Sequence, residues 1–411
     1  MGLNRRAAAI RAAYGDLRAQ GRDPAALRFD AVSSPTQGRL EGRDVTLFGT
    51  NNYLGLTFDP VCVEAAADAA RAWGAGTTGS RIANGSYGAH LMLEQEIAAF
   101  YARRGAVVFS TGYLANLGVI SALAEKGDHL LIDADSHASI YDGCRLSDAD
   151  TIRFRHNDPE SLARRLARLE GTPGDKIIVV EGIYSMLGDA GRLREIAAVK
   201  REAGPDVYLL ADEAHSLGVL GANGRGKAEA DGVEADCDYV VGTFSKSVGS
   251  VGGFCVSDRE ELDALRSYSR PYMFTASMTP ATVAGARAGF AQMQARPELR
   301  DRLWDNARRL YAALDALGFA LGPEPSPVIA VQLADAAQAV ALWNALIDAG
   351  LYTNVALPPA TPNGISLLRV SVSAAHTPAE IDWAVEVFAA AGVAIGVLPL
   401  SAGASRAAGA A

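Results

Sequence analysis

The sequence predicts an α/β protein with a mostly parallel central sheet and a smaller C-terminal α+β domain. Short apolar runs alternate with helical stretches between about residues 60 and 285, which is typical of a parallel sheet covered on both faces. Beyond residue 285, longer helical stretches separate two strand-like segments. We therefore expect an N-terminal helix and strand arm in residues 1–57, a large domain in residues 58–285, and a small domain in residues 286–411 with a mobile tail from about residue 400.

The spacing of apolar residues predicts the individual elements. Ile10, Tyr14 and Leu17 lie near helical spacing and predict a helix over residues 4–20, followed by a strand near residues 45–48. The large domain has six apolar runs of strand length, at residues 106–109, 129–132, 177–180, 207–210, 239–241 and 253–256. Helical stretches lie between these runs, for example at residues 91–103 and 158–169. The small domain is expected to have helices at residues 294–318, 335–350 and 378–392 and strands at residues 327–333 and 367–372.

Composition excludes several classes of function. The 411-residue chain has a net charge of -9, which is a poor match for nucleic acid, although one basic pocket could still bind a small anion. Its four cysteines have no metal-ligand spacing, so we expect reduced thiols and no metal site. No signal peptide and no apolar run long enough to span a membrane is recognised, and we expect a cytoplasmic protein, either free or peripheral at the inner membrane.

Polar side chains follow five of the predicted strands. In open α/β sheets, ligands bind beyond the carboxyl ends of the strands, so these side chains are candidates for one site. They are Ser110, Thr111, Gly112 and Tyr113 after the first run, Asp133, Asp135 and His137 after the second, Glu181 and Tyr184 after the third, Asp212, Glu213 and His215 after the fourth, and Thr243, Ser245 and Lys246 after the fifth. Taken singly, each has an ordinary interpretation, such as a helix cap for Asp212 or a solvated side chain for Lys246.

Together these residues match the four partners that pyridoxal phosphate (PLP) requires. Gly112 opens a helix whose N-terminus could hold a phosphate, and Asp212 could keep a pyridine nitrogen protonated. His215 could donate to a phenolic oxygen, and Lys246 could bind an aldehyde. A nucleotide site is the competing explanation for the glycines, but the chain has neither a P-loop nor a strand–GxGxxG–helix unit.

The same residues resemble the α-oxoamine synthases, PLP enzymes of fold type I with the aspartate aminotransferase fold. The resemblance covers about residues 40–395 and depends on motifs that are together specific to this family. They are Asn52-Tyr53-Leu54-Gly55, Gly79-Ser80-Arg81, Phe109 to Tyr113, Ser136-His137-Ala138-Ser139, Glu181 to Met186, Asp212-Glu213-Ala214-His215, and Gly242 to Lys246 before Gly252-Gly253.

Within the family, the chain most resembles the bacterial branch that joins L-serine to a long-chain acyl thioester, with release of carbon dioxide, to form 3-ketodihydrosphingosine. The stretches that carry this closer resemblance are residues 133–144, 242–253, 270–277 and 359–362. The acyl donor is expected to be palmitoyl-CoA, with an acyl carrier protein thioester as the other possibility. Sister synthases that form 8-amino-7-oxononanoate, 5-aminolevulinate or 2-amino-3-oxobutyrate remain alternatives, as do an aminotransferase and a catalytically silent partner subunit.

The resemblance also implies roles for particular residues. Lys246 would carry PLP as a Schiff base and act as general base, and Asp212 would pair with the ring nitrogen. His137 would stack on the ring and touch the substrate carboxylate, and His215 would donate to the phenolic oxygen. Gly112, Tyr113, Thr243 and Ser245 would flank the ring or phosphate, and Thr275 and Ser277 would reach the cofactor phosphate of the partner in a homodimer.

Two positions depart from the pattern of the relatives. Thr78 stands where relatives have Asn, and Leu357 stands where some relatives have a basic residue. The second departure makes Arg369 the main candidate for binding the substrate carboxylate.

Overall fold

The structure is a computed structural model that describes residues 4, 5, 7, 8, 15, 21–24, 26–358 and 360–399. Most of the helix predicted over residues 4–20, and the tail predicted from about residue 400, therefore lie outside the described residues. The chain forms two compact units. The large unit contains Asn52–Ser185 and Ala190–Arg300, and the small unit contains the residues up to Asn51, Met186–Asp189 and the residues from Asp301 onward.

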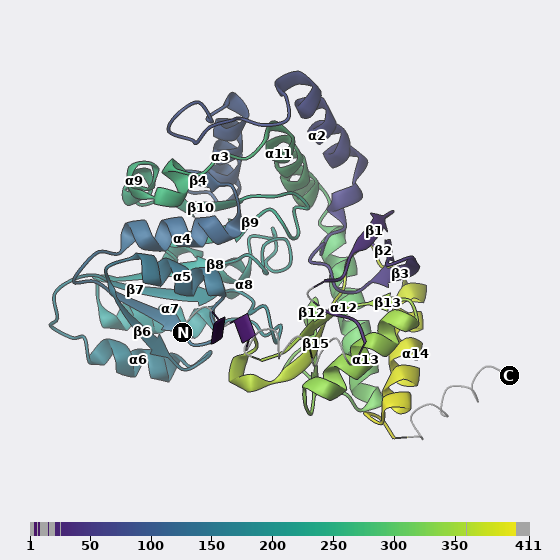
Figure 1. The fold of residues 1–411 in the computed structure, drawn as a ribbon. Helices are drawn as coiled ribbons and strands as arrows, with labels where there is room; N and C mark the ends of the chain where they lie inside the picture. The colour runs from purple at the N-terminus through teal and green to yellow at the C-terminus, as the bar shows by residue number, and fades with distance from the viewer. Residues whose placement is uncertain are drawn as a thin grey trace. The chain divides into compact units, whose positions relative to one another are not determined.

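The large unit is built on a seven-stranded sheet in the described part of the chain, with the order β4-β10-β9-β8-β7-β5-β6 (Figure 1). Its strands are β4 (Gly105–Phe109), β5 (His129–Asp133), β6 (Asp150–Phe154), β7 (Lys176–Glu181), β8 (Val207–Asp212), β9 (Tyr239–Thr243) and β10 (Gly253–Ser257). All neighbours from β6 to β9 pair in parallel, whereas β10 is antiparallel to both β9 and β4. The carboxyl ends of β4, β5, β7, β8 and β9 therefore lie at one edge of the sheet.

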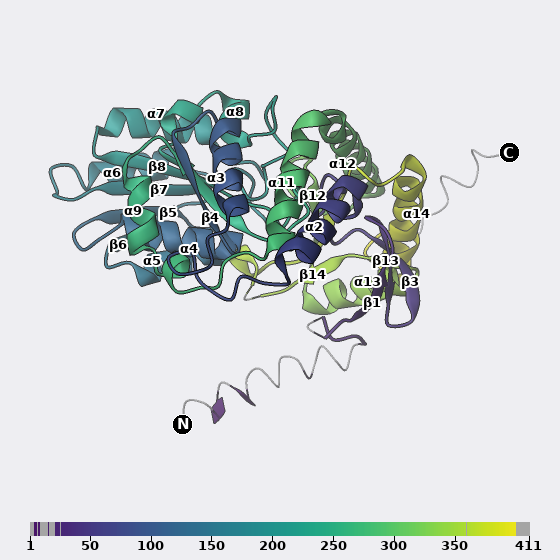
Figure 2. The same cartoon turned by 90° about the horizontal axis from the view of Figure 1, so that it is seen from above.

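Helices cover both faces of this sheet. They are α2 (Pro60–Trp73), α3 (Gly88–Phe100), α4 (Gly112–Leu123), α5 (Ala138–Leu146), α6 (Pro159–Ala167), α7 (Leu193–Ala203), α8 (Lys227–Asp231), α9 (Glu261–Tyr268), α10 (Arg270–Met273) and α11 (Pro280–Ala295). Figure 2 shows α4 and α5 on one side of the sheet and α7 and α8 on the other. A core of buried aliphatic residues, including Val119, Ile132 and Val179, fills the space between the sheet and α4 and α5. Burial on both faces explains why these strands are continuous apolar runs.

The small unit combines helices with two four-stranded sheets among its described residues, of order β1-β2-β3-β13 and β11-β12-β15-β14. Its strands are β1 (Phe29–Val32), β2 (Gln37–Leu40), β3 (Arg43–Leu47), β11 (Ala320–Leu321), β12 (Val328–Leu333), β13 (Leu351–Tyr352), β14 (Asn354–Ala356) and β15 (Ser366–Ser371). Its helices are α12 (Glu298–Leu317), α13 (Ala336–Asp348) and α14 (Pro378–Ile395). The helix α14 begins with a capping box between Thr377 and Glu380.

All six apolar runs of the large domain form strands, as predicted, and the sheet has a seventh strand that was not predicted. The missed strand, β6, is the edge strand, and exposed Thr151 and Arg153 alternate with more buried residues along it. The helix predicted at residues 294–318 is in fact two elements, because α11 ends at Ala295 and α12 begins at Glu298. Pro297 lies between them and disfavours helical backbone at the preceding residue.

Candidate active site

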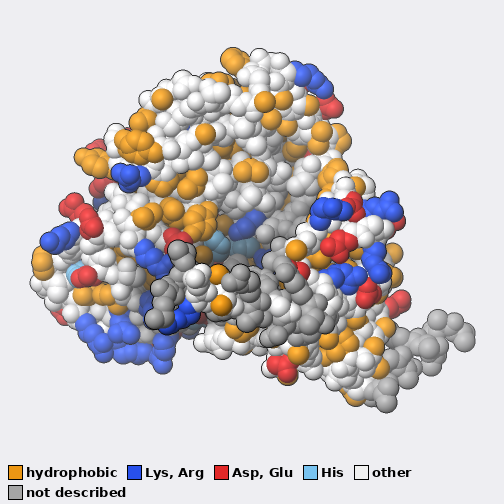
Figure 3. Space-filling model, in the orientation of Figure 1, with side chains coloured by type: hydrophobic (Ala, Val, Ile, Leu, Met, Phe, Trp, Pro, Cys, Tyr) orange, Lys and Arg blue, Asp and Glu red, His pale blue; other side chains and the backbone are white. Residues whose placement is uncertain are grey.

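The carboxyl ends of the central strands surround a cavity of about 250 Å³ in the large unit. It is lined by Thr111, Gly112, Tyr113, Asn116, His137, Ser139, Glu181, Asp212, Ala214, His215, Val241, Gly242, Thr243, Ser245 and Lys246. A hollow with histidine and basic side chains at its floor is visible in Figure 3. The structure thus brings together residues predicted from five strand ends, which lie between Thr111 and Lys246 in the sequence. Two larger cavities, of about 320 and 510 Å³, are lined largely by α6 and α7 and contain none of these residues.

Asp212 is held rigidly at the end of β8. Its side chain is buried, its Oδ1 accepts a hydrogen bond from the amide of Ala214 at 2.9 Å, and its Oδ2 accepts one from Asn116 Nδ2 at 2.6 Å. A carboxyl group with two fixed donors keeps its orientation in the cavity. This arrangement is suited to pairing with a cationic ring nitrogen.

His137 is connected to Asp212 through two side chains. Asn116 Nδ2 donates to Ser139 Oγ at 2.9 Å, and Ser139 Oγ lies 2.7 Å from His137 Nδ1. Because His137 Nδ1 also accepts from the amide of Ser139 at 3.2 Å, the proton of the neutral imidazole must be on Nε2. Burial lowers the pKa of His137, and the positive charge of Lys246 lowers it further, against the opposing effect of Asp212. We therefore expect a neutral imidazole that can donate from Nε2.

Glu181 at the end of β7 is a second buried carboxyl group beside this cluster. Its Oε1 accepts a hydrogen bond from the amide of His137 at 2.5 Å. Burial raises its pKa well above the usual value, and the nearby charge of Asp212 raises it further. Glu181 therefore keeps a proton more readily than an exposed carboxyl group, which limits the negative charge at the cavity floor.

Two further pairs of polar side chains line the cavity. His215 Nδ1 is hydrogen-bonded to the hydroxyl of buried Tyr53 at 2.8 Å, which fixes the imidazole ring. Thr243 Oγ1 lies 2.8 Å from Ser245 Oγ, and it donates to the carbonyl of Gly252 at 2.9 Å. If Thr243 uses its proton on Gly252, the hydroxyl of Ser245 donates to Thr243 or to a group in the cavity.

The N-terminus of α4 has the features of a phosphate cradle. Thr111 caps the helix by accepting from the amide of Leu114, and this leaves the first amides, those of Gly112 and Tyr113, without an intrahelical acceptor. Gly112 also packs closely against the sheet, because a Cβ atom there would lie 2.8 Å from both Cβ and Oγ1 of Thr243. A larger residue in place of Gly112 would therefore push the N-terminus of α4 away from the hydroxyl groups of Thr243 and Ser245. Amides, hydroxyls, a lysine and a buried carboxyl group are the partners that PLP needs, so the site fits this cofactor.

The strand-end candidates Ser110, Asp133, Asp135, Tyr184 and Glu213 are not among the residues that line the cavity. Three residues to which the resemblance gives a role also lie elsewhere. Thr275 and Ser277 follow α10 and line a separate small cavity of the large unit. Arg369 is a buried residue of β15 in the small unit, where its Nη1 donates to Asn51 Oδ1 at 3.0 Å and to Ser371 Oγ at 3.4 Å. The roles of these three residues stay predictions.

Three residues that hold the predicted side chains in place had no role predicted for them. Asn116 and Ser139 connect Asp212 to His137, and Tyr53 holds His215. Glu181, a candidate because it follows a strand, holds the backbone of His137. The available signal for Asn116 was its spacing, since it lies one helical turn after Gly112 and so on the same face of α4.

Comparison with known proteins identifies the family. Residues 43–388 match the model of the family named aminotransferase class I and II. The chain belongs to this family. It is 58% identical to a serine palmitoyltransferase of Caulobacter vibrioides over 97% of this chain and 98% of the relative. It is 36% identical to an 8-amino-7-oxononanoate synthase of Lysinibacillus sphaericus over 90% of this chain and 95% of the relative.

A solved structure in the same family has the same fold. It is a variant of the serine palmitoyltransferase of S. paucimobilis with a bound PLP–myriocin aldimine, and it has 49% sequence identity and a TM-score of 0.94, with 97% of this chain and all of that chain covered. The prediction of a PLP-dependent transferase of fold type I is thereby confirmed. Within the described residues, no helix combines the length and apolar character needed to cross a bilayer.

Proposed function

We propose that this protein catalyses the serine palmitoyltransferase reaction, the condensation of L-serine with a palmitoyl thioester to give 3-ketodihydrosphingosine, carbon dioxide and a free thiol. The observation that carries the proposal is the single buried cavity in which Lys246, Asp212 and His137 meet at the N-terminus of α4. The 58% identity to a serine palmitoyltransferase over nearly the whole chain supports the choice of substrates.

The residues around the cavity would hold PLP by its four functional groups. The amides of Gly112 and Tyr113 would bind the phosphate, Asp212 would bind the ring nitrogen, His215 would bind the phenolic oxygen, and Lys246 would bind the aldehyde. When bound, PLP supplies an electron-accepting ring that stabilises negative charge at the α-carbon of an amino acid. The hydrogen bond from Asn116 holds the carboxyl group of Asp212 in the orientation in which it would pair with the ring nitrogen.

Lys246 and His137 carry out the protein's part of the chemistry. The neutral amine of Lys246 takes the proton from the α-carbon of serine and can return a proton after carbon dioxide has left. His137 is neutral, with its proton on Nε2, and can donate to the serine carboxylate without introducing a second charge. Arg369 is proposed to bind the same carboxylate through its guanidinium group.

The acyl donor and the assembly are part of the proposal. We propose that palmitoyl-CoA serves as donor, with an acyl carrier protein thioester as the alternative, and that the protein is a homodimer. Large exposed apolar side chains on the large unit, Trp73, Tyr268 and Phe274, are each about 70% exposed, which supports burial against a second copy. Figure 3 shows hydrophobic side chains gathered over the region of α4 and α9. The cytoplasmic location and peripheral attachment to the inner membrane stay predictions.

A product assay with several amino acids tests the function. The purified, PLP-loaded protein is incubated with palmitoyl-CoA and with L-serine, L-alanine or glycine, and both the free thiol and the long-chain ketone are measured. We expect a higher kcat/KM for serine. A higher value for alanine or glycine would contradict the serine assignment and leave a sister synthase, and amino transfer without thiol release would indicate an aminotransferase. Absence of the visible absorbance of bound PLP would favour the silent-subunit alternative.

A further inference from the structure

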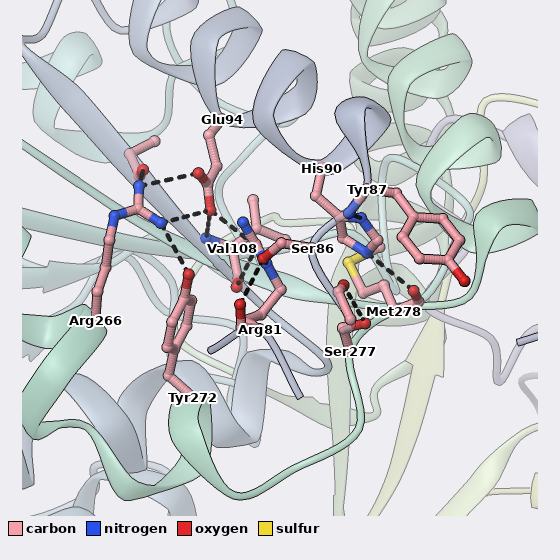
Figure 4. A network of polar contacts seen from close by, with 12 residues as sticks. Arg81, Ser86, Tyr87, His90, Glu94, Val108, Arg266, Tyr272, Ser277 and Met278 are labelled. Atoms are coloured by element: carbon pink, nitrogen blue, oxygen red, sulfur yellow. Dashed lines mark hydrogen bonds and ion pairs between the residues drawn. The ribbon is translucent and has the colours of Figure 1, made fainter. Parts of the chain in front are cut away.

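The segment that carries Thr275 and Ser277 is fastened to a tight turn formed by residues 77–86 (Figure 4). The amide of Ser277 donates to the carbonyl of Gly79 at 3.0 Å, and Ser80 and Ala276 form an antiparallel bridge. On the other side, Ser110 Oγ donates to the carbonyl of Ala276 at 2.5 Å. The backbone of Ala276 and Ser277 is therefore hydrogen-bonded to the turn, and the turn fixes the position of this extended segment.

The hydroxyl of Ser277 also takes part in the contact between this segment and the turn. Ser277 Oγ lies 2.7 Å from the carbonyl oxygen of Gly85 and 2.7 Å from Thr77 Oγ1. Ser277 has a single hydroxyl proton, and both neighbours can accept it, since the hydroxyl of Thr77 can itself donate to the carbonyl of Gly79 at 3.3 Å. Ser277 is also buried. It therefore has no proton left to donate to a ligand.

Thr275, two residues earlier, has the opposite character. Its side chain is half-buried and lines the small cavity near Arg81, and its hydroxyl makes no hydrogen bond within the described residues. The cavity has about 10 Å³ of free space, enough for one oxygen atom. The hydroxyl of Thr275 can therefore donate to a ligand without breaking a contact of the protein.

The surroundings of this cavity favour an anion. Arg81 and Arg266 both bind Glu94, so the buried cluster carries two positive charges and one negative charge. Arg81 is 7% exposed, and its Nη2 atom is buried without an acceptor. Burial, and then the charge of Arg81, lower the pKa of His90, which also lines the cavity. A buried cluster with a net positive charge, and with a guanidinium nitrogen that has no acceptor, attracts negative charge.

The turn is rigid enough to serve as a support. A Cβ atom on Gly85 would lie 2.1 Å from the carbonyl oxygen of Gly79, and one on Gly79 would lie 1.9 Å from Asn84 Oδ1. Asn84 Nδ2 also donates to the carbonyl of Thr77 at 3.0 Å. The turn therefore packs tightly against its own backbone, and Ser277 is hydrogen-bonded to Gly79 and Gly85 within it.

We propose a division of roles between the two hydroxyl residues: Thr275 contacts a phosphate group, and Ser277 is a positioning residue that holds Thr275 in place. The proposal rests on the proposed function, because the phosphate is that of PLP bound in a second copy of the chain. It differs from the expectation that both hydroxyls bind the phosphate. Arg81 supplies positive charge behind Thr275.

Three variants separate the two roles. Thr275→Val removes the free hydroxyl at almost constant shape. Ser277→Ala removes the hydroxyl that is bonded to Gly85 and Thr77, and Thr77→Val removes the hydroxyl to which Ser277 is bonded. We measure the melting temperature of the cofactor-free protein, the Kd for PLP from its visible absorbance, and the ³¹P resonance of the bound phosphate. For Thr275→Val we expect an unchanged melting temperature, a PLP Kd raised about 10- to 100-fold, and a shifted ³¹P resonance.

For Ser277→Ala and Thr77→Val we expect a melting temperature lowered by about 2–4 °C before any cofactor is added, together with a smaller ³¹P shift in the same direction. An unchanged melting temperature in Ser277→Ala, with a loss of PLP affinity equal to that of Thr275→Val, would overturn the proposal. So would a lowered melting temperature with no ³¹P shift, which would make Ser277 merely structural. If the unsubstituted protein did not bind PLP at all, the proposed function would fail. The melting temperatures would still test whether the hydrogen bonds of Ser277 to Gly85 and Thr77 stabilise the protein.

Discussion

Replacing Asn116 with Asp is expected to make the enzyme dependent on low pH. Asn116 Nδ2 donates to Asp212 Oδ2 at 2.6 Å inside the buried cavity. A carboxyl group at this position can make the same hydrogen bond only while it is protonated. When it ionises, two negative charges face each other in place of one hydrogen bond, and Asp212 keeps only the amide of Ala214 as a donor.

The size of the effect follows from the geometry. Two charges roughly 4 Å apart repel by about 4 kcal/mol at an effective dielectric constant of about 20. This energy raises the second pKa of the pair by about three units, from the usual value near 4 to about 7. Since the folded-state pKa is raised above the unfolded one, the folded protein binds the extra proton more tightly. Stability is then fully present below about pH 4 and is lost progressively as the pH rises to about 7.

The assay compares kcat of Asn116→Asp with that of the unsubstituted protein at each pH between about 5.5 and 8.5. Below the new pKa we expect the ratio to recover to within about tenfold of unity, because the contact to Ser139 is still altered, and above it the ratio should fall about tenfold per pH unit. The melting temperature of the cofactor-free variant should fall over the same range. Asn116→Leu, which cannot donate at any pH, is the control and should show a low ratio throughout. A ratio independent of pH, or an unimpaired Asn116→Leu protein, would refute the assigned role of Asn116.

Three other substitutions have defined outcomes. Lys246→Ala should fold normally and lose more than about 1000-fold in kcat, since the residue lies in the cavity and not in the core; normal turnover would end the cofactor assignment. Arg369→Ala should raise the apparent Kd for serine by about 10- to 100-fold, with the absorbance of bound PLP retained, and an unchanged serine affinity would place the carboxylate elsewhere. Thr78→Asn should stabilise the protein by about 1 kcal/mol, because Thr78 has a φ of 57°, a backbone region that a β-branched residue adopts only under strain and that Asn tolerates; a lower melting temperature would show that the contact of Thr78 Oγ1 with Asn84 matters more.

The strands of the large unit were predictable because they are buried on both faces. A strand that is buried on both faces needs a continuous apolar run, and each such run can be recognised in the sequence alone. The edge strand β6 has one exposed side and so lacks this signal. The antiparallel direction of β10 was not predictable, because its residues Gly253–Ser257 are as apolar as those of a parallel strand.

The candidate site was predictable where a functional side chain directly follows a strand. Asp212 and Lys246 lie at or just after strand ends, so the topology alone brings them to one edge of the sheet. Asn116 lies in the body of a helix, where an amide side chain usually faces solvent, and only the folded structure shows that it is bonded to Asp212. Tyr53 precedes all the strands of the large sheet, and nothing in its local sequence relates it to His215.

A residue's type and its position in a motif limit its chemistry, but its role depends on which of its protons are already in use. Thr275 and Ser277 carry the same functional group two residues apart, and their sequence context treats them alike. Their contacts do not: the hydroxyl of Ser277 is fully used between Gly85 and Thr77, whereas that of Thr275 is free beside a buried positive charge. The same reasoning applies to His137, since Ser139 occupies its Nδ1 atom and so determines that Nε2 is the atom able to donate. Both assignments follow from counting donors and acceptors, and the one for Ser277 can be tested by removing the neighbouring hydroxyl of Thr77.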